Sequence, residues 1–299
     1  MRKVRQVIGR SVSRRVWKQL RQGPSVARVL ASFEHACDLI TAEGDIVALV
    51  TRRVGDGPLN VVVEGAAGLF AEMEAGATAR LTGEEIRFSL LTVDLRGATV
   101  WEPRPNWGSL RARRAAIVAH LPALRVLCLK CAPPGSLLAL LESPSAGGVP
   151  RGATIAAARK ATGDLQAGWA GDEARLRTGA ARLSGLGGGL TPSGDDFLTG
   201  VMLWAWLAHP APGPFCHILV EAAAGLTTTL SAAFLQAAAR GECSGAWHRL
   251  ITALGEGTDA EVAGAAQGVL AHGATSGADG LAGFLWAGLS TDRLRRERS

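Results

Sequence analysis

Short runs of apolar residues, many of them β-branched, dominate the first third of the chain. DIVALV and LNVVVE are separated by VGDGP, whose glycine, aspartate and proline are typical of a turn. ASFEHACDLI precedes them, and IRFSLLTVDL and ATVW follow, with AAGLFAEMEA between as an expected helix. The pattern predicts a small, mostly antiparallel β domain over residues 26–105, which ends near the proline-flanked EPRPNW.

Alanine, leucine and arginine at helical spacing replace this pattern in the other two thirds of the chain. SLRARRAAIVAHL and DEARLRTGAARLS precede a glycine-rich stretch, and several apolar helices are expected after it. Thr258 and Glu261 have the spacing of a capping box, which marks one helix start. Residues 106–299 are therefore predicted to form a larger α-helical domain, and the overall class is α+β.

The net charge of +6 changes this picture little, because it is concentrated at the two ends. Residues 1–22 carry eight Lys or Arg and no acid, and residues 291–299 carry four Arg against two acids, so the body between them has a net charge of −4. Residues 1–25 are accordingly predicted to be a basic, solvated N-terminal tail. A groove for nucleic acid is not expected.

Other classes of protein are excluded by what the sequence lacks. No apolar run approaches the roughly 20 residues that a membrane span needs, and the basic N-terminus has no secretory-signal pattern, so a cytoplasmic protein without a membrane partner is expected. The five cysteines form no disulfide framework, and Cys128 and Cys131 are interpreted as buried thiols rather than as zinc ligands. No metal and no cofactor is predicted.

The stretch GLGGGLTPSGDDFLTG, residues 185–200, is the strongest candidate for chemistry. Such a density of glycine is costly to order, which suggests a close backbone approach to a ligand or to another helix. Ser193 and Asp196 stand at N-cap and N3 spacing, so the loop is predicted to end at a helix N-terminus.

A similar frame recurs 83 residues later. Ser193 to Gly200 and Ser276 to Gly283 share S-G-x-D-x-L-x-G, each followed by an apolar helix. Gly200 and Gly283 lie one turn into these helices, where a small residue would allow close crossing and bring two helix N-termini together. Such termini would pool up to about four free N–H groups each and favour an anion. The alternative is that both motifs serve capping and helix packing alone.

The predicted anion site combines backbone and hydroxyl groups from both motifs with one further threonine. Its binding residues are Gly187, Gly188, Gly189, Thr191, Ser193, Gly194, Thr275, Ser276, Asp279 and Thr228. Thr228 belongs to a cluster, Thr227 to Thr229 with Ser231, that could equally serve as redundant helix caps.

Two adjacent carboxylates, Asp195 and Asp196, are the candidate catalytic residues. Asp195 has no capping task and is expected to stay ionised, as a base or as a group that orients the ligand. The alternative is a solvent-facing acid of the first helical turn. Paired aspartates could also hold Mg²⁺ through a bound phosphate, although nothing else in the sequence demands a metal.

GLGGGLTPSGDDFLTG, TTTLSAAFLQAAARGE and GATSGADGLAGF occur in this order and resemble the three signature blocks of the AllH family. The resemblance covers about residues 26–290 and leaves out the basic first 22. It implies a subunit of an oxamate carbamoyltransferase, which interconverts oxalurate plus phosphate with oxamate plus carbamoyl phosphate and needs companion subunits. On this basis Gly187 to Gly189, Thr191 and Ser193 would cradle phosphate, and Asp195 would orient or deprotonate the carbamoyl nitrogen.

Two other classes remain open at this point. A binding or assembly module would hold a small anion at the same loop without turning it over. An enzyme that acts on a different small anionic metabolite would share the site and change the acceptor.

Overall fold

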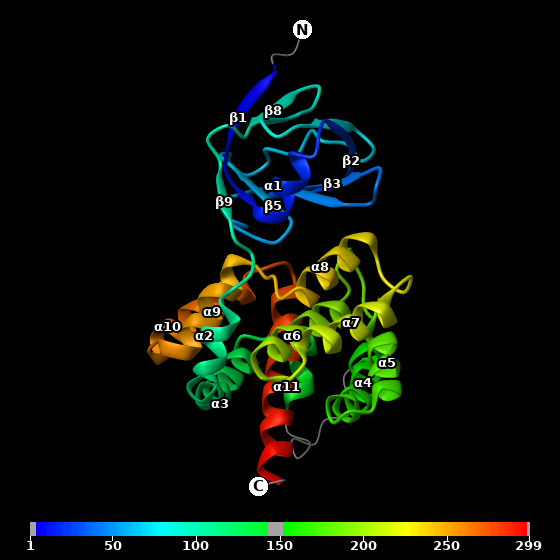
Figure 1. Cartoon of the computed structure of the whole chain (residues 1–299), viewed down its shortest axis with the longest axis vertical. Coiled ribbons are helices and arrows are strands. Elements are labelled where there is room, and N and C mark those ends of the chain that lie inside the picture. Colours follow the sequence, from blue (N-terminus) through cyan, green and yellow to red (C-terminus); the bar gives the residue numbers. More distant parts are fainter. Residues whose placement is uncertain (1–3, 143–151, 298–299) are drawn as a thin grey trace. The chain divides into compact units, whose positions relative to one another are not determined.

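The structure is a computed structural model that describes residues 4–142 and 152–297, with side chains as far as Thr291. The chain divides into two compact units and is α+β overall (Figure 1). One unit comprises Met1–Pro103 together with Cys243–Gly245, and the other comprises Arg104–Glu242 and Ala246–Ser299. Residues 1–3 of the predicted tail and residues 298–299 of the basic C-terminal segment lie outside the described residues.

The first unit is built around a closed β-barrel. Its elements are β1 (Arg5–Ser13), α1 (Arg14–Leu20), β2 (Ser25–Ser32), β3 (Ala36–Thr41), β4 (Ile46–Thr51), β5 (Asn60–Val63), β6 (Thr78–Leu81), β7 (Glu85–Arg87), β8 (Leu91–Asp94) and β9 (Thr99–Trp101). The strand order is β5-β4-β3-β2-β6-β7-β8-β1-β9, and pairing of β5 with β1 closes eight strands into a ring. Most pairings are antiparallel; β1 with β8, β1 with β9 and β4 with β5 are parallel.

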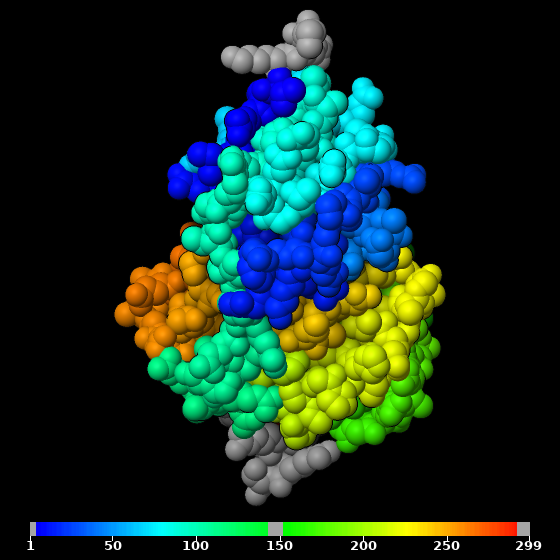
Figure 2. Space-filling model, turned by 45° about the horizontal axis from the view of Figure 1, so that its top comes forward, coloured from blue at the N-terminus to red at the C-terminus, as the bar shows by residue number. Residues whose placement is uncertain are grey.

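The prediction that the basic N-terminus is a solvated tail was wrong for residues 5–20. Residues of β1 pair with three strands, which makes β1 the strand that closes the barrel, and Figure 2 shows its blue surface against cyan residues of the same unit. Arg5 and Arg10 are exposed, whereas Gly9 and Val12 are buried. The buried positions of β1 are small or apolar and its arginines are exposed, so the count of basic residues did not reveal the strand.

The barrel interior is filled by apolar side chains that include Leu39, Leu49, Leu81 and Ile86. Phe70 joins them and is fully buried. It comes from AAGLFAEMEA, whose predicted helix was wrong, because these residues form successive turns. Gly68 there adopts φ +78°, which a right-handed helix does not permit, and the Ala71 N–H donates to the Gly68 carbonyl at 3.1 Å.

The second unit is helical. Its elements are α2 (Trp107–Ala112), α3 (Arg114–Lys130), the 3₁₀ turn η1 (Leu137–Leu141), α4 (Ala153–Trp169), α5 (Glu173–Leu183), α6 (Ser193–Ala208), α7 (Pro212–Ala223), α8 (Thr229–Ala239), α9 (Gly245–Glu256), α10 (Asp259–Leu270) and α11 (Ser276–Glu297). The capping box of Thr258 and Glu261 is confirmed at the start of α10. None of the helices in the described ranges is long and apolar enough to cross a membrane.

Helices α6 and α11 form the centre of this unit and cross at glycine contacts (Figure 1). A Cβ on Gly200 would lie 1.9 Å from the Gly280 carbonyl oxygen, and one on Gly283 would lie 1.9 Å from the Phe197 carbonyl oxygen. Real Cβ atoms do not approach so closely, so the two backbones touch where the side chains are missing. The predicted close crossing is confirmed.

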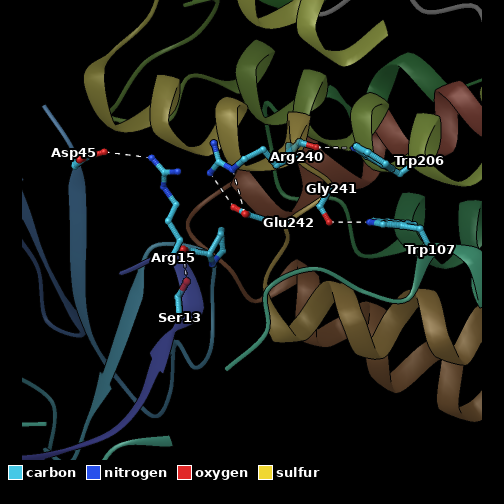
Figure 3. Close-up of polar contacts among 10 residues, drawn as sticks. Ser13, Arg15, Asp45, Trp107, Trp206, Arg240, Gly241 and Glu242 are labelled. Carbon is cyan, nitrogen blue, oxygen red and sulfur yellow. Dashed lines mark hydrogen bonds and ion pairs between the residues drawn. The ribbon is translucent and has the colours of Figure 1, made fainter. Parts of the chain in front are cut away.

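Tryptophan side chains bond to carbonyl groups at the C-terminal end of α8 (Figure 3). The indole N–H of Trp107 donates to the Gly241 carbonyl at 2.8 Å, and that of Trp206 donates to Ala238 at 3.1 Å. Arg111 donates to the carbonyls of Trp206 and His209 at the C-terminus of α6, both at 2.7 Å. These bonds satisfy carbonyl groups that a helix end leaves unpaired.

Candidate functional site

The glycine-rich loop leads from α5 into α6 and lies at the surface. Gly187, Gly188 and Gly189 are exposed, and Gly187 and Gly189 have φ values of +114° and +86°. A Cβ on Gly185 would lie 2.2 Å from the Leu226 carbonyl oxygen, so this glycine permits contact between two loops. Gly188 has open space around its Cβ position. The loop therefore exposes backbone that no side chain shields.

The start of α6 differs from the predicted cap. Pro192 is the N-cap, and Ser193 is the first helical residue without a side-chain cap. Because the Pro192 carbonyl accepts from the Asp195 and Asp196 amides at 2.9 and 3.2 Å, and the Gly194 amide donates to Leu186 at 2.9 Å, most of the first-turn N–H groups are already paired. The predicted capping roles of Ser193 and Asp196 were wrong, and fewer free N–H groups remain than the sequence suggested.

The start of α11 has the same construction. Gly277 donates to the His272 carbonyl at 3.0 Å, and Asp279 donates to the Thr275 carbonyl at 2.8 Å. A Cβ on Gly277 would lie 1.9 Å from the Val269 carbonyl oxygen, just as one on Gly194 would lie 2.0 Å from that of Leu183. In both motifs the glycine after the serine permits close approach of the preceding helix.

The two motifs meet through their hydroxyl groups. Thr191 Oγ1 and Ser276 Oγ lie 2.9 Å apart and share a hydrogen bond. The Ser276 and Thr191 hydroxyls also bond to Asp196 and lower its pKa, while those of Ser193 and Thr275 act in the same way on Asp279. The aspartate of each motif, Asp196 or Asp279, therefore accepts a hydrogen bond from the serine of the other motif. The structure brings together both predicted halves of the site.

Asp196 combines burial with an unsatisfied oxygen. Burial raises the pKa of this carboxyl to about 8, Ser276 opposes the rise, and the nearby charges of Asp279 and Asp195 add to it. Its Oδ2 atom is buried and has no hydrogen-bond partner. With that pKa the group is mostly protonated at neutral pH, and it then presents a donor as well as an acceptor.

Asp279 is fully buried, with 0% of its surface exposed. Its Oδ1 accepts from the Leu137 amide of η1 at 2.6 Å, whereas Oδ2 has no partner. Burial raises its pKa, and the Leu137 amide opposes that rise. Leu137 was not predicted as part of the site. Its contribution is a backbone N–H supplied by tertiary packing, for which the sequence carries no signal.

Asp195 is not the solvent-facing acid that the sequence left open, because only 1% of its surface is exposed. It accepts from Thr227 Oγ1 at 2.5 Å and from the Gly185 amide at 3.2 and 3.3 Å. Burial raises the pKa of Asp195, and these donors oppose the rise. The carboxyl joins the glycine loop to the loop before α8. Its hydroxyl partner, Thr227, was not among the predicted site residues.

The side chain of Thr228 also contacts the glycine loop, at a main-chain carbonyl group of that loop. It is the N-cap of α8 and accepts from the Ser231 amide at 3.0 Å. Its own hydroxyl donates to the Leu190 carbonyl at 2.5 Å. The capping alternative for this threonine is confirmed, and the same side chain holds the end of the loop.

The charge of the assembled site is unusual for an anion site. The side chains brought together are Thr191, Ser193, Asp195, Asp196, Thr227, Thr275, Ser276 and Asp279, with no Lys or Arg among them. Within residues 4–142 and 152–297, no group of three or more His, Cys, Asp or Glu side chains is arranged to hold a metal ion. An anion at this place needs donors or positive charge from elsewhere.

Two family models match the chain. The AllH family N-terminal domain matches residues 8–100, and the model described as oxamate carbamoyltransferase subunit AllH matches residues 183–288. The chain belongs to the AllH family. The second match contains both S-G-x-D motifs, and the first begins within β1, so the family domain includes part of the N-terminal segment that the sequence resemblance left out. Searches of curated proteins and of solved structures found no significant match to this AllH-family chain.

Proposed function

We propose that this AllH-family chain is the substrate-holding subunit of an oxamate carbamoyltransferase-type complex. The observation that carries the proposal is the 2.9 Å contact between Thr191 and Ser276, which joins the two motifs beside an exposed glycine loop. Both residues lie in the segment that matches the carbamoyltransferase subunit model. The reaction interconverts oxalurate and phosphate with oxamate and carbamoyl phosphate, so every ligand is a small anion.

The phosphate group is proposed to lie against the glycine loop. Exposed backbone at Gly187 to Gly189 allows a ligand to approach main-chain N–H groups without steric hindrance, and Gly188 has open space where a side chain would be. The hydroxyls of Thr191, Ser193 and Ser276 each have a single donor proton, which would turn from the carboxyls of Asp196 and Asp279 toward phosphate oxygens when the ligand binds. Thr275 and Asp279 complete the far side of the cluster, and Gly194 and Thr228 hold its backbone in place.

Carbamoyl transfer places negative charge on a tetrahedral centre, and donors aimed at that centre accelerate it. Toward oxalurate, the oxamate nitrogen attacks the carbamoyl carbon, the C–O bond to phosphate breaks, and the proton lost by nitrogen passes to the departing phosphate. A protonated Asp196, whose pKa is raised to about 8, would donate a hydrogen bond to the developing oxyanion. Asp196 is therefore proposed as the catalytic residue.

Asp195 is proposed as a positioning residue. The two carboxylate oxygens of Asp195 already accept hydrogen bonds from Thr227 and Gly185. Asp195 therefore acts on the ligand indirectly, because it anchors the glycine loop. Asp195 would then orient the carbamoyl nitrogen indirectly, by fixing the position of the backbone from Gly185 to Gly189.

Companion subunits are proposed to complete the site. The cluster holds three carboxyl groups and no Lys or Arg, so cationic groups that attract an anionic substrate must come from outside it. Leu190 and Leu226 flank the glycine loop with 37% and 51% of their surface exposed. Thr228 joins the two loops by its bond to the Leu190 carbonyl. A companion subunit that covers these leucines would bring its own basic residues to the loop.

The test is reconstitution of the complex and measurement of carbamoyl phosphate formation from oxalurate and phosphate. Ser276→Ala and Thr191→Val each remove one donor and should lower kcat/KM roughly 10- to 100-fold, the cost of a hydrogen bond to a charged group. Thr178→Val is the matched control, since Thr178 bonds only within α5 to Ala174 and is exposed. Full activity of both site variants, or a wild-type complex without turnover, would contradict the proposal.

The alternative of a non-catalytic subunit is separated by a binding measurement on the same proteins. Calorimetric titration with carbamoyl phosphate should show binding that Ser276→Ala weakens. Binding that persists in a complex without turnover would identify an anion-holding assembly subunit. Turnover of a different carbamoyl acceptor would place the chain in another pathway of nitrogen metabolism.

A further inference from the structure

The two S-G-x-D motifs contact each other reciprocally. A Cβ on Gly200 would lie 1.9 Å from the carbonyl oxygen of Gly280. A Cβ on Gly283 would lie 1.9 Å from the carbonyl oxygen of Phe197. Gly280 is the counterpart of Phe197 in the other motif, and Gly283 is the counterpart of Gly200. Such reciprocal contacts are those of two units related by a two-fold axis, so α6 and α11 are two halves of a repeat.

The repeat includes the helix before each motif. A Cβ on Gly194 would lie 2.0 Å from the carbonyl oxygen of Leu183, the last residue of α5. Its counterpart Gly277 makes the same approach to Val269 in the last turn of α10, at 1.9 Å. One half of the repeat is therefore α5, the glycine-rich loop and α6, and the other is α10, a shorter loop and α11.

The shorter loop, residues 271–275, is called the second loop here. Each of the two loops places a glycine with positive φ against the serine of its own motif. A Cβ on Gly187 would lie 3.3 Å from Ser193 Oγ, and one on Gly273 would lie 3.1 Å from Ser276 Oγ. The second loop thus occupies the same place in its half of the repeat as the glycine loop does in the first.

The second loop presents main-chain donors that lack acceptors. Ala271 to Ala274 are exposed, and Gly273 has a φ of +63°. The amides of residues 273–276 donate to no carbonyl oxygen in the part of the chain that the structure describes. Successive free N–H groups in a turn of this kind form a concave anion site. The loop contains no acid, and the exposed imidazole of His272 adds a side-chain donor.

A fully buried carboxyl group lies beside the second loop. Thr275, at the end of this loop, bonds to Asp279, whose Oδ2 atom has no partner. Buried polar atoms in folded proteins nearly always have a partner, so the unpaired oxygen indicates a polar component that the chain does not supply. Burial raises the pKa of Asp279, and a protonated carboxyl group does not repel an anion.

We propose that the second loop, with His272, binds the carboxylate group of the carbamoyl acceptor, a small amide-bearing acid of the oxamate class. This inference rests on the proposed function, which places phosphate at the glycine loop. The 2.9 Å contact between Thr191 and Ser276 joins the ends of the two loops, so ligands held by them lie side by side. Each half of the repeat then holds one of the two substrates, and the acceptor nitrogen faces the carbamoyl carbon.

The experiment measures both substrates of the reconstituted complex in the direction of oxalurate synthesis. His272→Ala should raise the KM for oxamate roughly 10- to 100-fold, the effect of one hydrogen bond to a charged group, and leave the KM for carbamoyl phosphate unchanged. Gly273→Ala places a side chain at a positive φ and should act in the same direction. Oxamide, which has an amide in place of the carboxylate, should lose less from either substitution than oxamate does.

Two matched controls separate loss of the loop's donors from general effects of the substitutions. His217→Ala removes a histidine of α7 that has 71% of its side-chain surface exposed. Gly171→Ala introduces the same strain at a φ of +113°, between α4 and α5, with nothing within 4 Å of the added Cβ. Both controls should keep the wild-type KM for oxamate, and circular dichroism establishes that each variant is folded.

Calorimetric titration of the complex with oxamate, in the presence of inorganic phosphate, reads the second loop without turnover. A complex that binds oxamate through His272 but does not turn over would contradict the proposed function and retain this inference. The inference is overturned if the wild-type complex binds no oxamate. It is also overturned if folded His272→Ala and Gly273→Ala variants bind oxamate as tightly as the wild type, or if their losses fall equally on carbamoyl phosphate.

Discussion

The hydroxyl oxygens of Thr191 and Ser276 lie 2.9 Å apart although the residues are separated by 85 positions in the chain. This contact joins the glycine-rich motif to its later counterpart. It depends on the close crossing of α6 and α11, because only contact between the two backbones brings both helix starts within reach of a hydrogen bond.

The close crossing of α6 and α11 predicts that alanine substitution lowers the free energy of unfolding far more at a crossing glycine than at another glycine of the same unit. Gly200→Ala would place a Cβ 1.9 Å from the Gly280 carbonyl oxygen, so the helices must separate. We expect the free energy of unfolding to fall by at least about 1–3 kcal/mol, the usual cost of overpacking, measured by urea denaturation. Gly264→Ala in α10 is the control, because nothing lies within 4 Å of its Cβ position. Equal stability of the two variants would contradict the crossing.

The bond between Thr227 and Asp195 predicts a stability effect away from the ligand. Thr227→Val removes the donor to a carboxyl that is only 1% exposed. A buried acceptor left without its donor costs about 1–3 kcal/mol, and carbamoyl phosphate affinity should fall because the glycine loop loses its anchor. Thr162→Val, which removes an exposed bond within α4, is the control and should change neither quantity. Thermal unfolding and calorimetric titration measure the two effects, and wild-type values for Thr227→Val would count against the anchoring role.

The raised pKa of Asp196 predicts how stability depends on pH. The folded protein retains this proton up to about pH 8, whereas the unfolded chain releases it near its ordinary pKa of 3.8. Since the folded state binds more protons in this window, the free energy of unfolding falls as pH rises from about 4 to about 8. Asp196→Asn should reduce that slope. The pKa values of Asp195 and Asp279 are also raised, so these two residues contribute to the slope in the same direction.

Urea denaturation at a series of pH values measures this slope in both proteins. Parallel profiles for wild type and Asp196→Asn would show that the Asp196 carboxyl titrates normally.

The N-terminal strand predicts that a short truncation is severe. Deletion of residues 1–13 removes β1, whose partners β5 and β8 would then become open edges of the barrel. We expect loss of the cooperative unfolding transition of the first unit and aggregation, detected by calorimetry and size-exclusion chromatography. Deletion of residues 1–4, which precede β1, is the control and should leave the chain folded. A folded, soluble chain after the longer deletion would mean that the segment is the solvated tail its charge suggested.

Local sequence pattern predicted those features that local physics governs. The capping box at Thr258 follows from side-chain reach within one helical turn, and the division into a β-rich first third and a helical remainder follows from hydrophobic periodicity. Glycines at Gly200 and Gly283 indicated close helix crossing, because glycine inside a helix is unfavourable without a packing reason.

Reasoning from local sequence failed where a residue distant in the chain determines the local structure. Residues 66–75 have a helical composition, but the barrel interior takes up Phe70 and the turn at Gly68 ends any helix. The start of α6 shifted to Pro192 because its carbonyl accepts from two amides, which left Ser193 to act on Asp279 instead of capping its own helix.

The sequence by itself determined the family, the α+β class and the two S-G-x-D motifs, since these depend on residue identity and spacing. Only the tertiary structure decided that each motif's aspartate meets the other motif's hydroxyl, and that Asp195 anchors a loop while Asp196 and Asp279 keep an unpaired oxygen. The physical reason is that ionisation and hydrogen bonding of a carboxyl are set by burial and by neighbours in space. Those neighbours lie on α11, η1 and the loop before α8, tens of residues or more away along the chain.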